Sequence, residues 1–248
     1  MAGELYRDTG VVLRTYKLRE SDRIVVFHTA DNGKVRAVAK GVRKTKSKFG
    51  ARLEPMSHVR LQLYRGRELD IVTQAESVEP LAPMLSSLDR ASQGLAVIEA
   101  VDQLSLEREP NPQLYRMVVG VLRTIAATPN DATPSPLNVA AFYWKLLANE
   151  GMRPELDRCV RCGDTEPDVE FVAFDLNEGG VLCRTCRSGQ AISRGALTIL
   201  REILGGQLVQ ALARDESPLT HEVSSLATRA LEFHIERHLR AVAMFETH

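Results

Sequence analysis

Hydrophobic positions in the first 80 residues follow the alternation typical of β-strands. Five apolar or alternating runs are separated by polar turns: Gly10–Tyr16, Ile24–Phe27, Lys34–Val42, Val59–Tyr64 and Leu69–Gln74. Between the second and third runs, Asn32-Gly33 predicts a tight hairpin because both residues tolerate positive φ. Five short strands with no helix-length period between most of them predict a small closed or half-closed barrel; an open sheet is the alternative.

After Pro83 the apolar residues recur at the three-and-four spacing of amphipathic helices. Five segments show it: Leu85–Leu106, Gln113–Ala127, Leu137–Glu150, Gly195–Leu204 and Thr220–Met244. Ser193 is expected to cap the fourth of these helices. The chain is therefore expected to hold a barrel domain over residues 1–80 and a helical domain over residues 81–158 and 191–248. An insert over residues 159–190 interrupts the helical domain.

The composition is that of a soluble globular protein, with 44% hydrophobic and 26% charged residues. No run approaches the roughly 18 to 20 apolar residues that a membrane span needs. The N-terminal sequence lacks the basic and then apolar pattern of a signal peptide. We therefore expect a cytoplasmic protein that does not associate with membranes.

The net charge of zero hides a strong asymmetry along the chain. Residues 1–80 carry six more basic than acidic residues, and the remainder carries six more acidic than basic residues. Eight basic residues and no acidic residue lie between Asp31 and Glu54. Such a local field attracts polyanions even when the whole molecule is neutral.

The basic stretch combines a predicted strand with a predicted loop. Lys34, Arg36 and Lys40 lie on one face of the strand, and the loop that follows can track a phosphate backbone. Phe49, Tyr64 and Tyr16 are candidate stacking platforms for unpaired bases. The candidate nucleic-acid-binding residues are Lys34, Arg36, Lys40, Arg43, Lys44, Lys46, Lys48, Phe49 and Arg52. The alternative interpretation is a solvated charged loop.

All four cysteines fall into two matched pairs. Cys159 and Cys162 form one Cys-x-x-Cys turn, and Cys183 and Cys186 form the other, with twenty residues between the pairs. Two such turns can close a tetrahedron of thiolates around zinc. The stretch Phe171–Leu176 and the Gly179-Gly180 turn predict a short hairpin between them.

Other chemistry of these cysteines fits the pattern less well. Two disulfides would need an oxidising compartment, and a thioredoxin-like redox site uses a single pair in a βαβ setting. A catalytic zinc keeps an open coordination position, whereas four thiolates fill it. We therefore expect one structural Zn²⁺ ion.

The sequence contains no recognisable catalytic motif. A phosphate-binding Gly-x-x-x-x-Gly-Lys-Ser/Thr loop, a nucleophile motif and a paired carboxylate cluster are all missing from it. We expect a binding protein rather than an enzyme, with a metal-dependent nuclease as the enzymatic alternative. A second alternative is an RNA-binding barrel with a zinc ribbon that serves transcription or ribosome assembly.

Several segments of the chain resemble the RecO family of bacterial recombination mediators. They are Gly10–Leu13, Tyr16–Glu20, Asp22, Asn32–Lys34, Ala39–Arg43, Lys46–Phe49, Leu53–Pro55 and Leu69–Gln74. The four-cysteine insert within a helical half and the length of the chain agree with this family. The resemblance spans nearly the whole chain, although it is diffuse over residues 81–158.

The resemblance implies an α+β multidomain protein, with an N-terminal OB-fold β-barrel followed by an all-α domain carrying an inserted four-cysteine zinc knuckle. It implies a non-enzymatic protein that binds single- and double-stranded DNA and anneals complementary strands without ATP. With RecR, such proteins help RecA replace the single-stranded DNA-binding protein on gapped DNA, which places them at the nucleoid during repair.

Family members also bind the acidic C-terminal tail of the single-stranded DNA-binding protein through the helical domain. The expected cationic rim of that site is Arg116, Arg123 and Lys145. Its expected apolar floor is Leu122, Leu146 and Leu147.

Overall fold

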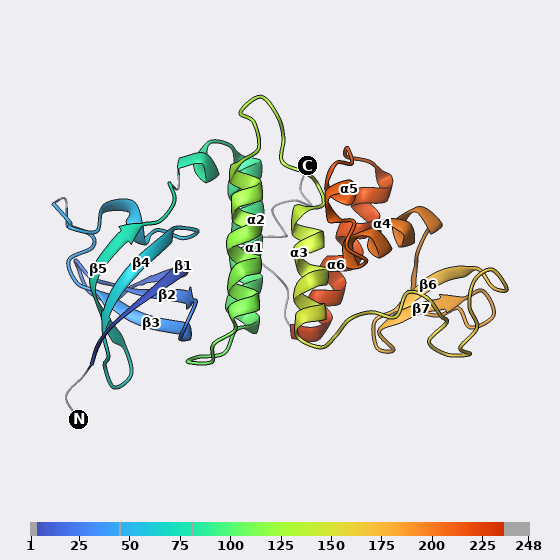
Figure 1. Cartoon of the computed structure of the whole chain (residues 1–248), viewed down its shortest axis with the longest axis horizontal. Helices are drawn as coiled ribbons and strands as arrows, with labels where there is room; N and C mark the ends of the chain where they lie inside the picture. The colour runs from blue at the N-terminus through green and yellow to red at the C-terminus, as the bar shows by residue number, and fades with distance from the viewer. Residues whose placement is uncertain (1–3, 45, 81, 236–248) are drawn as a thin grey trace. The chain divides into compact units, whose positions relative to one another are not determined.

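The computed structural model describes residues 4–44, 46–80 and 82–235 (Figure 1). Within them the chain divides between Thr133 and Pro134 into two compact units. Unit 1 contains the strands of the barrel and two helices. Unit 2 contains four helices and the cysteine-bearing segment. Each unit is described by itself.

Five strands form the barrel of unit 1: β1 (Leu5–Lys17), β2 (Arg23–Thr29), β3 (Gly33–Ala39), β4 (His58–Tyr64) and β5 (Asp70–Ser77). Their order is β1-β2-β3-β5-β4, and β1 also pairs with β4, which closes the barrel. Neighbouring strands are antiparallel except for β3 and β5, which are parallel. This is the OB-like closed barrel that the sequence predicts, and it excludes the open sheet.

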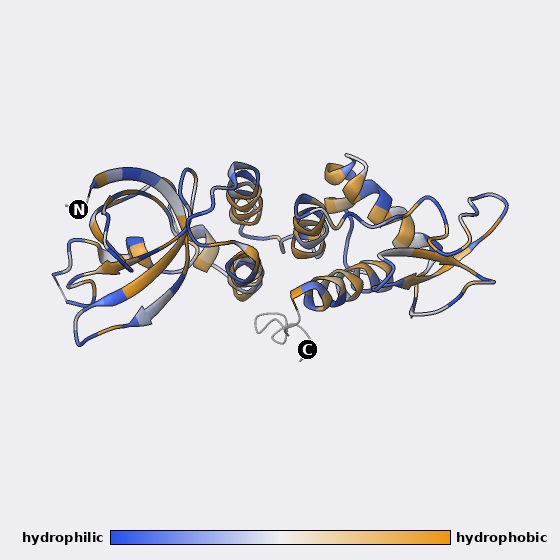
Figure 2. Cartoon of the chain, turned by 90° about the horizontal axis from the view of Figure 1, so that it is seen from below, coloured by the Kyte–Doolittle hydropathy of each residue, from blue (hydrophilic) through white to orange (hydrophobic). Residues whose placement is uncertain are grey.

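The barrel encloses a hydrophobic core built by alternation along each strand. Phe27, Val35, Leu61 and Leu63 point inward and are at most 1% exposed. Hydrophilic residues are frequent in the loops that connect the strands (Figure 2). Burial of one face of every strand therefore fixes which side chains remain on the outer surface.

The predicted third strand is shorter than the sequence indicates. It ends at Ala39 rather than Val42, because Gly41 adopts a φ of 67° that turns the chain away from the sheet. Lys40 therefore lies just beyond the strand and not on its face, which corrects the expectation for this residue. The short 3₁₀ helix η1 (Gly50–Leu53) follows the loop and leads toward β4.

The helices α1 (Leu88–Leu104) and α2 (Pro112–Ala126) belong to unit 1. The predicted start of the first helix at Leu85 is wrong. A short 3₁₀ helix, η2 (Ala82–Leu85), comes first, and the Ser87 side chain then caps α1 by accepting a hydrogen bond from the backbone N–H of Arg90.

The connection between α1 and α2 is fastened to the barrel by backbone hydrogen bonds. Lys34 N–H donates to the carbonyl of Leu106 (3.2 Å), and Arg108 N–H donates to the carbonyl of Lys34 (3.0 Å). Gly33 lies so close to Glu109 that an added Cβ would fall 2.0 Å from its carbonyl oxygen. The two helices thus pack with the barrel, although the sequence assigns residues 81–158 to the helical domain. Contacts between distant segments decide this grouping.

Unit 2 contains the helices α3 (Asn138–Asn149), α4 (Arg194–Leu204), α5 (Leu208–Leu212) and α6 (Pro218–Ile235). The predicted cap of α4 is confirmed, because the Ser193 hydroxyl accepts a hydrogen bond from Ala196 N–H. The sequence did not predict α5, whose five residues are too few to show a helical period. The predicted continuation of the last helix to Met244 lies outside the described residues, as does the end of the predicted helical domain.

Residues 159–191 form the cysteine ribbon of unit 2. It contains β6 (Phe171–Asp175), β7 (Gly180–Cys183) and β8 (Gln190–Ala191), in the order β7-β6-β8. The hairpin of β6 and β7 confirms the prediction from the sequence. Phe174 packs edge-on against Trp144 of α3, with ring centroids 5.7 Å apart, and so joins the ribbon to the helices.

None of the helices within the described residues is long and apolar enough to cross a membrane.

Candidate nucleic-acid interface and metal centre

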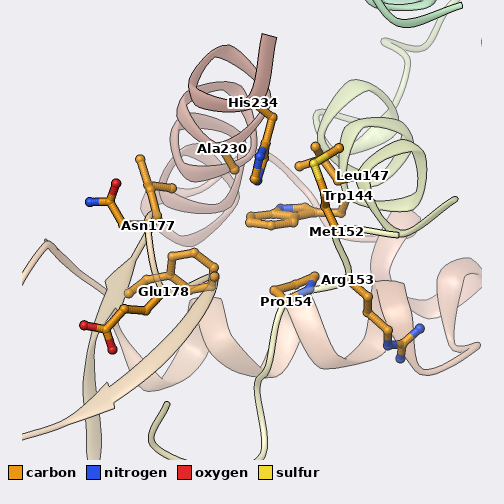
Figure 3. A pocket seen from close by; sticks show the side chains of 12 residues that line it. Trp144, Leu147, Met152, Arg153, Pro154, Asn177, Glu178, Ala230 and His234 are labelled. Carbon is orange, nitrogen blue, oxygen red and sulfur yellow. The ribbon is translucent and has the colours of Figure 1, made fainter. Parts of the chain in front are cut away.

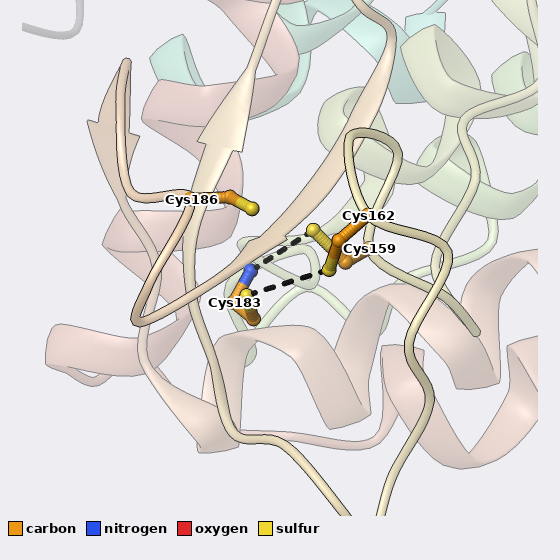
Figure 4. Close-up of side chains that lie close together, drawn as sticks. All are labelled: Cys159, Cys162, Cys183 and Cys186. Carbon is orange, nitrogen blue, oxygen red and sulfur yellow. Dashed lines mark hydrogen bonds between the residues drawn. The ribbon is translucent and has the colours of Figure 1, made fainter.

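The four cysteines converge at one end of the ribbon. All four sulfur atoms lie within 4.8 Å of one another, and the sulfurs of Cys162 and Cys183 are 3.8 Å apart (Figure 4). A tetrahedron with metal–sulfur distances of about 2.3 Å has edges of about 3.8 Å. None of the cysteines forms a disulfide. The site therefore has the donor set and the dimensions of a four-thiolate metal centre, as the spacing of the two pairs predicts.

The backbone around Cys159 favours the thiolate form of that residue. Cys183 N–H donates to the sulfur of Cys159 at 3.4 Å. Burial raises the pKa of Cys159, but backbone N–H groups of Cys162, Cys183 and Arg161 outweigh it and lower the pKa to about 6. Deprotonated sulfur is the form that binds metal.

Polar side chains hold the turns of the ribbon in place. Arg161 donates to the carboxylate of Glu178 (2.5 Å) and to the carbonyl of Cys186 (3.0 Å), linking the first cysteine pair to the second. The Asp175 carboxylate accepts hydrogen bonds from the backbone N–H groups of Asn177 and Glu178. These residues have structural roles beside the cysteines.

The basic loop, residues 40–44 and 46–49, lies on the barrel beside the turn between β1 and β2. The Asp22 carboxylate accepts a hydrogen bond from Gly41 N–H (2.7 Å), which lowers the pKa of Asp22. Arg43 N–H donates to the carbonyl of Ser21 (3.0 Å). The turn at Ser21 and Asp22 thus supports the start of the loop, and Asp22 is one of the residues that carry the family resemblance.

Most of the predicted cations of this region are exposed to solvent. They are Arg36, Lys40, Arg43, Lys44, Lys46, Lys48 and Arg52. Several also hydrogen-bond the backbone: Arg43 donates to the carbonyl of Glu20, Lys48 to that of Thr73, and Arg52 to that of Lys48. Carbonyl groups orient these side chains without neutralising them, so the positive charge remains available to a polyanion.

Two of the predicted nucleic-acid-binding residues are placed differently from the expectation. Phe49 is 1% exposed and belongs to the barrel core, so it cannot serve as a stacking platform. The Lys34 side chain is only 15% exposed; its ammonium group donates to the carbonyl of Asp102 at 2.6 Å and lies 3.6 Å from the Asp102 carboxylate. Packing of the loop and of α1 against the barrel causes both differences.

Acidic residues of the helical segment also approach two exposed arginines of the barrel. Asp102 lies 2.7 Å from Arg14, and Glu107 lies 3.6 Å from Arg36. The sequence did not single out Arg14, since it lies outside the basic stretch. Strand register brings Arg14 and Arg36 to the two sides of Val26.

Two histidines are buried where α2 covers the barrel. His28 is 0% exposed, and His58 donates to or accepts from the Tyr115 hydroxyl at 2.8 Å. Burial, followed by the nearby Lys34 charge, lowers the pKa of His28 to about 4. Burial lowers the pKa of His58 as well. Both rings are therefore neutral at physiological pH.

The residues expected to bind an acidic tail are divided between the two units. Arg116 and Arg123 are exposed on α2, where Arg123 forms an ion pair with Glu79, and Lys145 lies on α3. The expectation that Leu122, Leu146 and Leu147 form the apolar floor of an exposed site is wrong, because these side chains are at most 6% exposed. These leucines face the hydrophobic interior, as the helical period requires.

Unit 2 also contains a cavity of about 190 Å³ beside Trp144. In Figure 3 the Trp144 ring lies at the centre, with His234 above it and Pro154 below. Met152 and Arg153 contribute to the wall. The indole N–H of Trp144 is buried and has no hydrogen-bond partner among the described residues. The cavity thus combines apolar side chains with the charged groups of Arg153 and Glu178 and the ring of His234.

Two family models match the chain. The model described as recombination protein O N terminal covers residues 1–81, and the model described as recombination protein O C terminal covers residues 85–243. The two matches meet near the end of β5, where the barrel strands give way to helices.

Proposed function

Because the chain belongs to the recombination protein O family, whose members are DNA recombination and repair mediators, we propose that it acts in the recombinational repair of gapped DNA. It binds DNA through the barrel and anneals complementary strands without ATP. With RecR, it loads RecA onto DNA covered by single-stranded DNA-binding protein. It makes and breaks no covalent bond.

The observation that carries this proposal is the exposed basic loop on a closed OB-like barrel. Lys40, Arg43, Lys44, Lys46 and Lys48 are exposed. A cationic surface reduces the repulsion between two phosphate backbones, and contacts without base specificity let strands search for their register. Arg36 and Arg52 extend this surface. Lys34 contributes to the packing of the barrel instead.

The proposal is tested by strand annealing without ATP on DNA coated with its cognate binding protein. The wild type is compared with a variant carrying Arg43→Glu, Lys44→Glu, Lys46→Glu and Lys48→Glu. We expect annealing by the wild type and its loss in the variant. Equal annealing by both would refute the proposed surface. Competition with a matched RNA strand tests the choice of DNA.

Salt dependence gives a second measurement of the same surface. If about six cations contact single-stranded phosphates, log affinity falls with log salt at a slope near −4. The fourfold variant should reduce the magnitude of this slope by about 3, because each lost contact removes roughly 0.7. A slope near zero for the wild type would exclude electrostatic binding.

The metal of the cysteine centre is proposed to be one structural Zn²⁺ ion, held by Cys159, Cys162, Cys183 and Cys186. Four thiolates at tetrahedral spacing suit zinc and fill its coordination shell. When bound, the ion supplies folding free energy to the ribbon. Metal analysis of the purified protein tests the identity and the stoichiometry.

The acidic tail of the single-stranded DNA-binding protein is the proposed protein partner of the helices. Arg116 and Arg123 lie two helical turns apart on one face of α2 and provide a cationic pair, whereas Lys145 lies in unit 2. The cavity beside Trp144, with Arg153 in its wall, provides a second candidate site. Tail-peptide binding should be lost with Arg116→Glu and Arg123→Glu if α2 is the site. If the cavity beside Trp144 is the site, tail-peptide binding should instead be lost with Arg153→Glu.

A further inference from the structure

The four cysteines of the ribbon differ in how far solvent reaches them. Cys159 is 0% exposed and Cys183 is 1% exposed, whereas Cys186 is partly exposed and Cys162 is fully at the surface. Buried thiols are chemically inert, while accessible thiolates react with oxidants. Oxidation of this cluster should therefore begin on its outer side.

Cys162 lies in a turn that is open to solvent. Residues 161–165 are all exposed, and a Cβ added to Gly163 would meet no heavy atom of the described residues within 4 Å. The ribbon carries more acidic than basic residues, and the Asp164 carboxylate lies 3.2 Å from the Cys162 sulfur. Negative surroundings repel anionic oxidants but not neutral ones. The oxidant that suits this site is therefore a small neutral peroxide.

A second sulfur lies within reach of Cys162. The Cys183 sulfur is 3.8 Å away (Figure 4), so the two atoms must approach by about 1.8 Å to reach the length of a disulfide bond. Cys183 belongs to β7 and pairs with Phe171 of β6, whereas Cys162 belongs to the exposed turn. The turn can therefore close the gap while the strand stays in place.

We propose that Cys162 is a site of oxidation by hydrogen peroxide, and that Cys183 converts the oxidised sulfur into a disulfide that dismantles the metal centre. The inference rests on the proposed function in one respect, namely that the four cysteines hold Zn²⁺. Sulfur atoms that serve as metal ligands are deprotonated, which is the form that attacks a peroxide.

The reaction takes place in two steps. The Cys162 thiolate attacks one oxygen of the peroxide, the O–O bond breaks, and the sulfur becomes a sulfenic acid, while the released hydroxide takes a proton and forms water. The Cys183 thiolate then attacks this sulfur, so that the S–S bond forms, the S–O bond breaks and a second hydroxide leaves as water. The two sulfur atoms lose the two electrons that the peroxide gains.

The disulfide removes half of the ligand set. Cys159 and Cys186 alone do not fill the four-coordinate shell of zinc, so the ribbon loses the ion and the folding free energy that binding supplies. This loss reaches Trp144 through its contact with Phe174. All four cysteines lie in unit 2, so unit 1 keeps its fold. Dithiols reduce such a disulfide, which makes the change reversible.

The test follows oxidation and metal release in the full-length protein, isolated with its metal. Hydrogen peroxide is added in the presence of a chromogenic zinc chelator, and mass spectrometry of alkylated peptides maps the disulfide. We expect zinc to appear in proportion to a disulfide between Cys162 and Cys183, together with a change in Trp144 fluorescence. A dithiol with added Zn²⁺ should restore the fluorescence, which it would not do after methionine oxidation.

Two matched variants separate attack at Cys162 from oxidation anywhere in the cluster. Cys162→His and Cys186→His each keep a complete ligand set, because three thiolates and one imidazole also bind zinc. Cys162→His should slow the release of zinc by peroxide about tenfold or more, since it removes the accessible sulfur. Cys186→His keeps Cys162 and Cys183 and should release zinc like the wild type. If either variant binds no zinc, trapping of sulfenic acid with dimedone in the wild type replaces it and should label Cys162 first.

The outcomes distinguish the inference from the proposed metal. Equal slowing in both variants, equal dimedone labelling of Cys162 and Cys186, or a disulfide between any other pair would overturn the inference. Retention of zinc by the wild type in excess peroxide would overturn it as well, and would leave the structural zinc intact. A folded wild-type protein that contains no zinc would instead overturn the proposed metal.

Discussion

The barrel and the cysteine ribbon use charge in opposite ways. The ribbon carries six acidic and three basic residues, and two of its arginines pair with carboxylates: Arg161 with Glu178 and Arg184 with Glu170. The basic loop of the barrel instead presents its cations to solvent, with backbone carbonyls as their partners. This difference supports the proposal that the barrel loop is the binding surface and that the ribbon has a structural role.

The two regions also differ in what stabilises them. The barrel encloses a core of large apolar side chains such as Phe27 and Phe49. The ribbon is a segment of about thirty residues, too short to bury a core of that size by itself. The four cysteines and the packing of Phe174 on Trp144 take that role. Removing the metal should therefore affect one region and spare the other.

The largest expected effect is loss of the metal centre. Cys183→Ser, or chelation, should unfold the ribbon, since zinc supplies on the order of 10 kcal/mol to sites of this kind. Trp144 is the single tryptophan and contacts the ribbon through Phe174, so its fluorescence reports this loss. DNA binding by the barrel should persist. A ribbon that keeps its Trp144 signal after complete metal removal would contradict the prediction.

An intermediate effect is expected from pH on unit 1. The folded pKa of His28 is lowered to about 4 from the ordinary value of 6.5. The unfolded chain therefore binds more protons between these values, and stability falls as pH decreases from about 7 to about 4. If the whole pKa shift of His28 is realised, the free energy of unfolding decreases by about 3 kcal/mol over this pH range.

The measurement is denaturant unfolding of the wild type and of His28→Phe across this pH range. The variant lacks the titrating ring, so its stability should decline less on acidification. The lowered pKa of His58 leaves a residual dependence of the same sign. Identical pH profiles for the two proteins would show that His28 does not contribute.

The smallest expected effect concerns Glu107, the acidic residue that pairs with Arg36 of the proposed DNA-binding surface. Glu107→Gln frees Arg36 from its ion pair, which is 3.6 Å long with both side chains exposed. We expect DNA affinity to rise by less than about fivefold, because exposed pairs contribute at most about 1 kcal/mol. The salt slope should steepen by up to roughly 0.7.

A matched control is available on the neighbouring strands. Arg60 of β4 and Glu76 of β5 form an exposed pair with the same 3.6 Å separation. Glu76→Gln removes one acidic charge without freeing Arg36. Fluorescence-anisotropy titration measures the DNA affinity of both variants. If both raise the affinity equally, the gain comes from net charge, and the specific role of Glu107 is refuted.

The sequence by itself determined the features that depend on local spacing. Two Cys-x-x-Cys pairs predicted the cluster of four thiols, and alternation with an Asn-Gly turn predicted the strands of a barrel. The inward positions of β3, such as Val35 and Ala37, follow from the same period of two. Ser193 capped its helix as predicted because a cap is a contact between residues three apart.

Only the tertiary structure decided the features that depend on contacts between distant segments. Lys34 pairs with Asp102, 68 residues away, and Phe49 enters the core because the loop folds over the barrel. The grouping of α1 and α2 with the barrel arises in the same way. The placement of Arg14 and Arg36 on the two sides of Val26 needs the register of two strand pairs, which alternation within each strand does not specify. Local pattern thus fixes which way a side chain faces, and register fixes which side chains it meets.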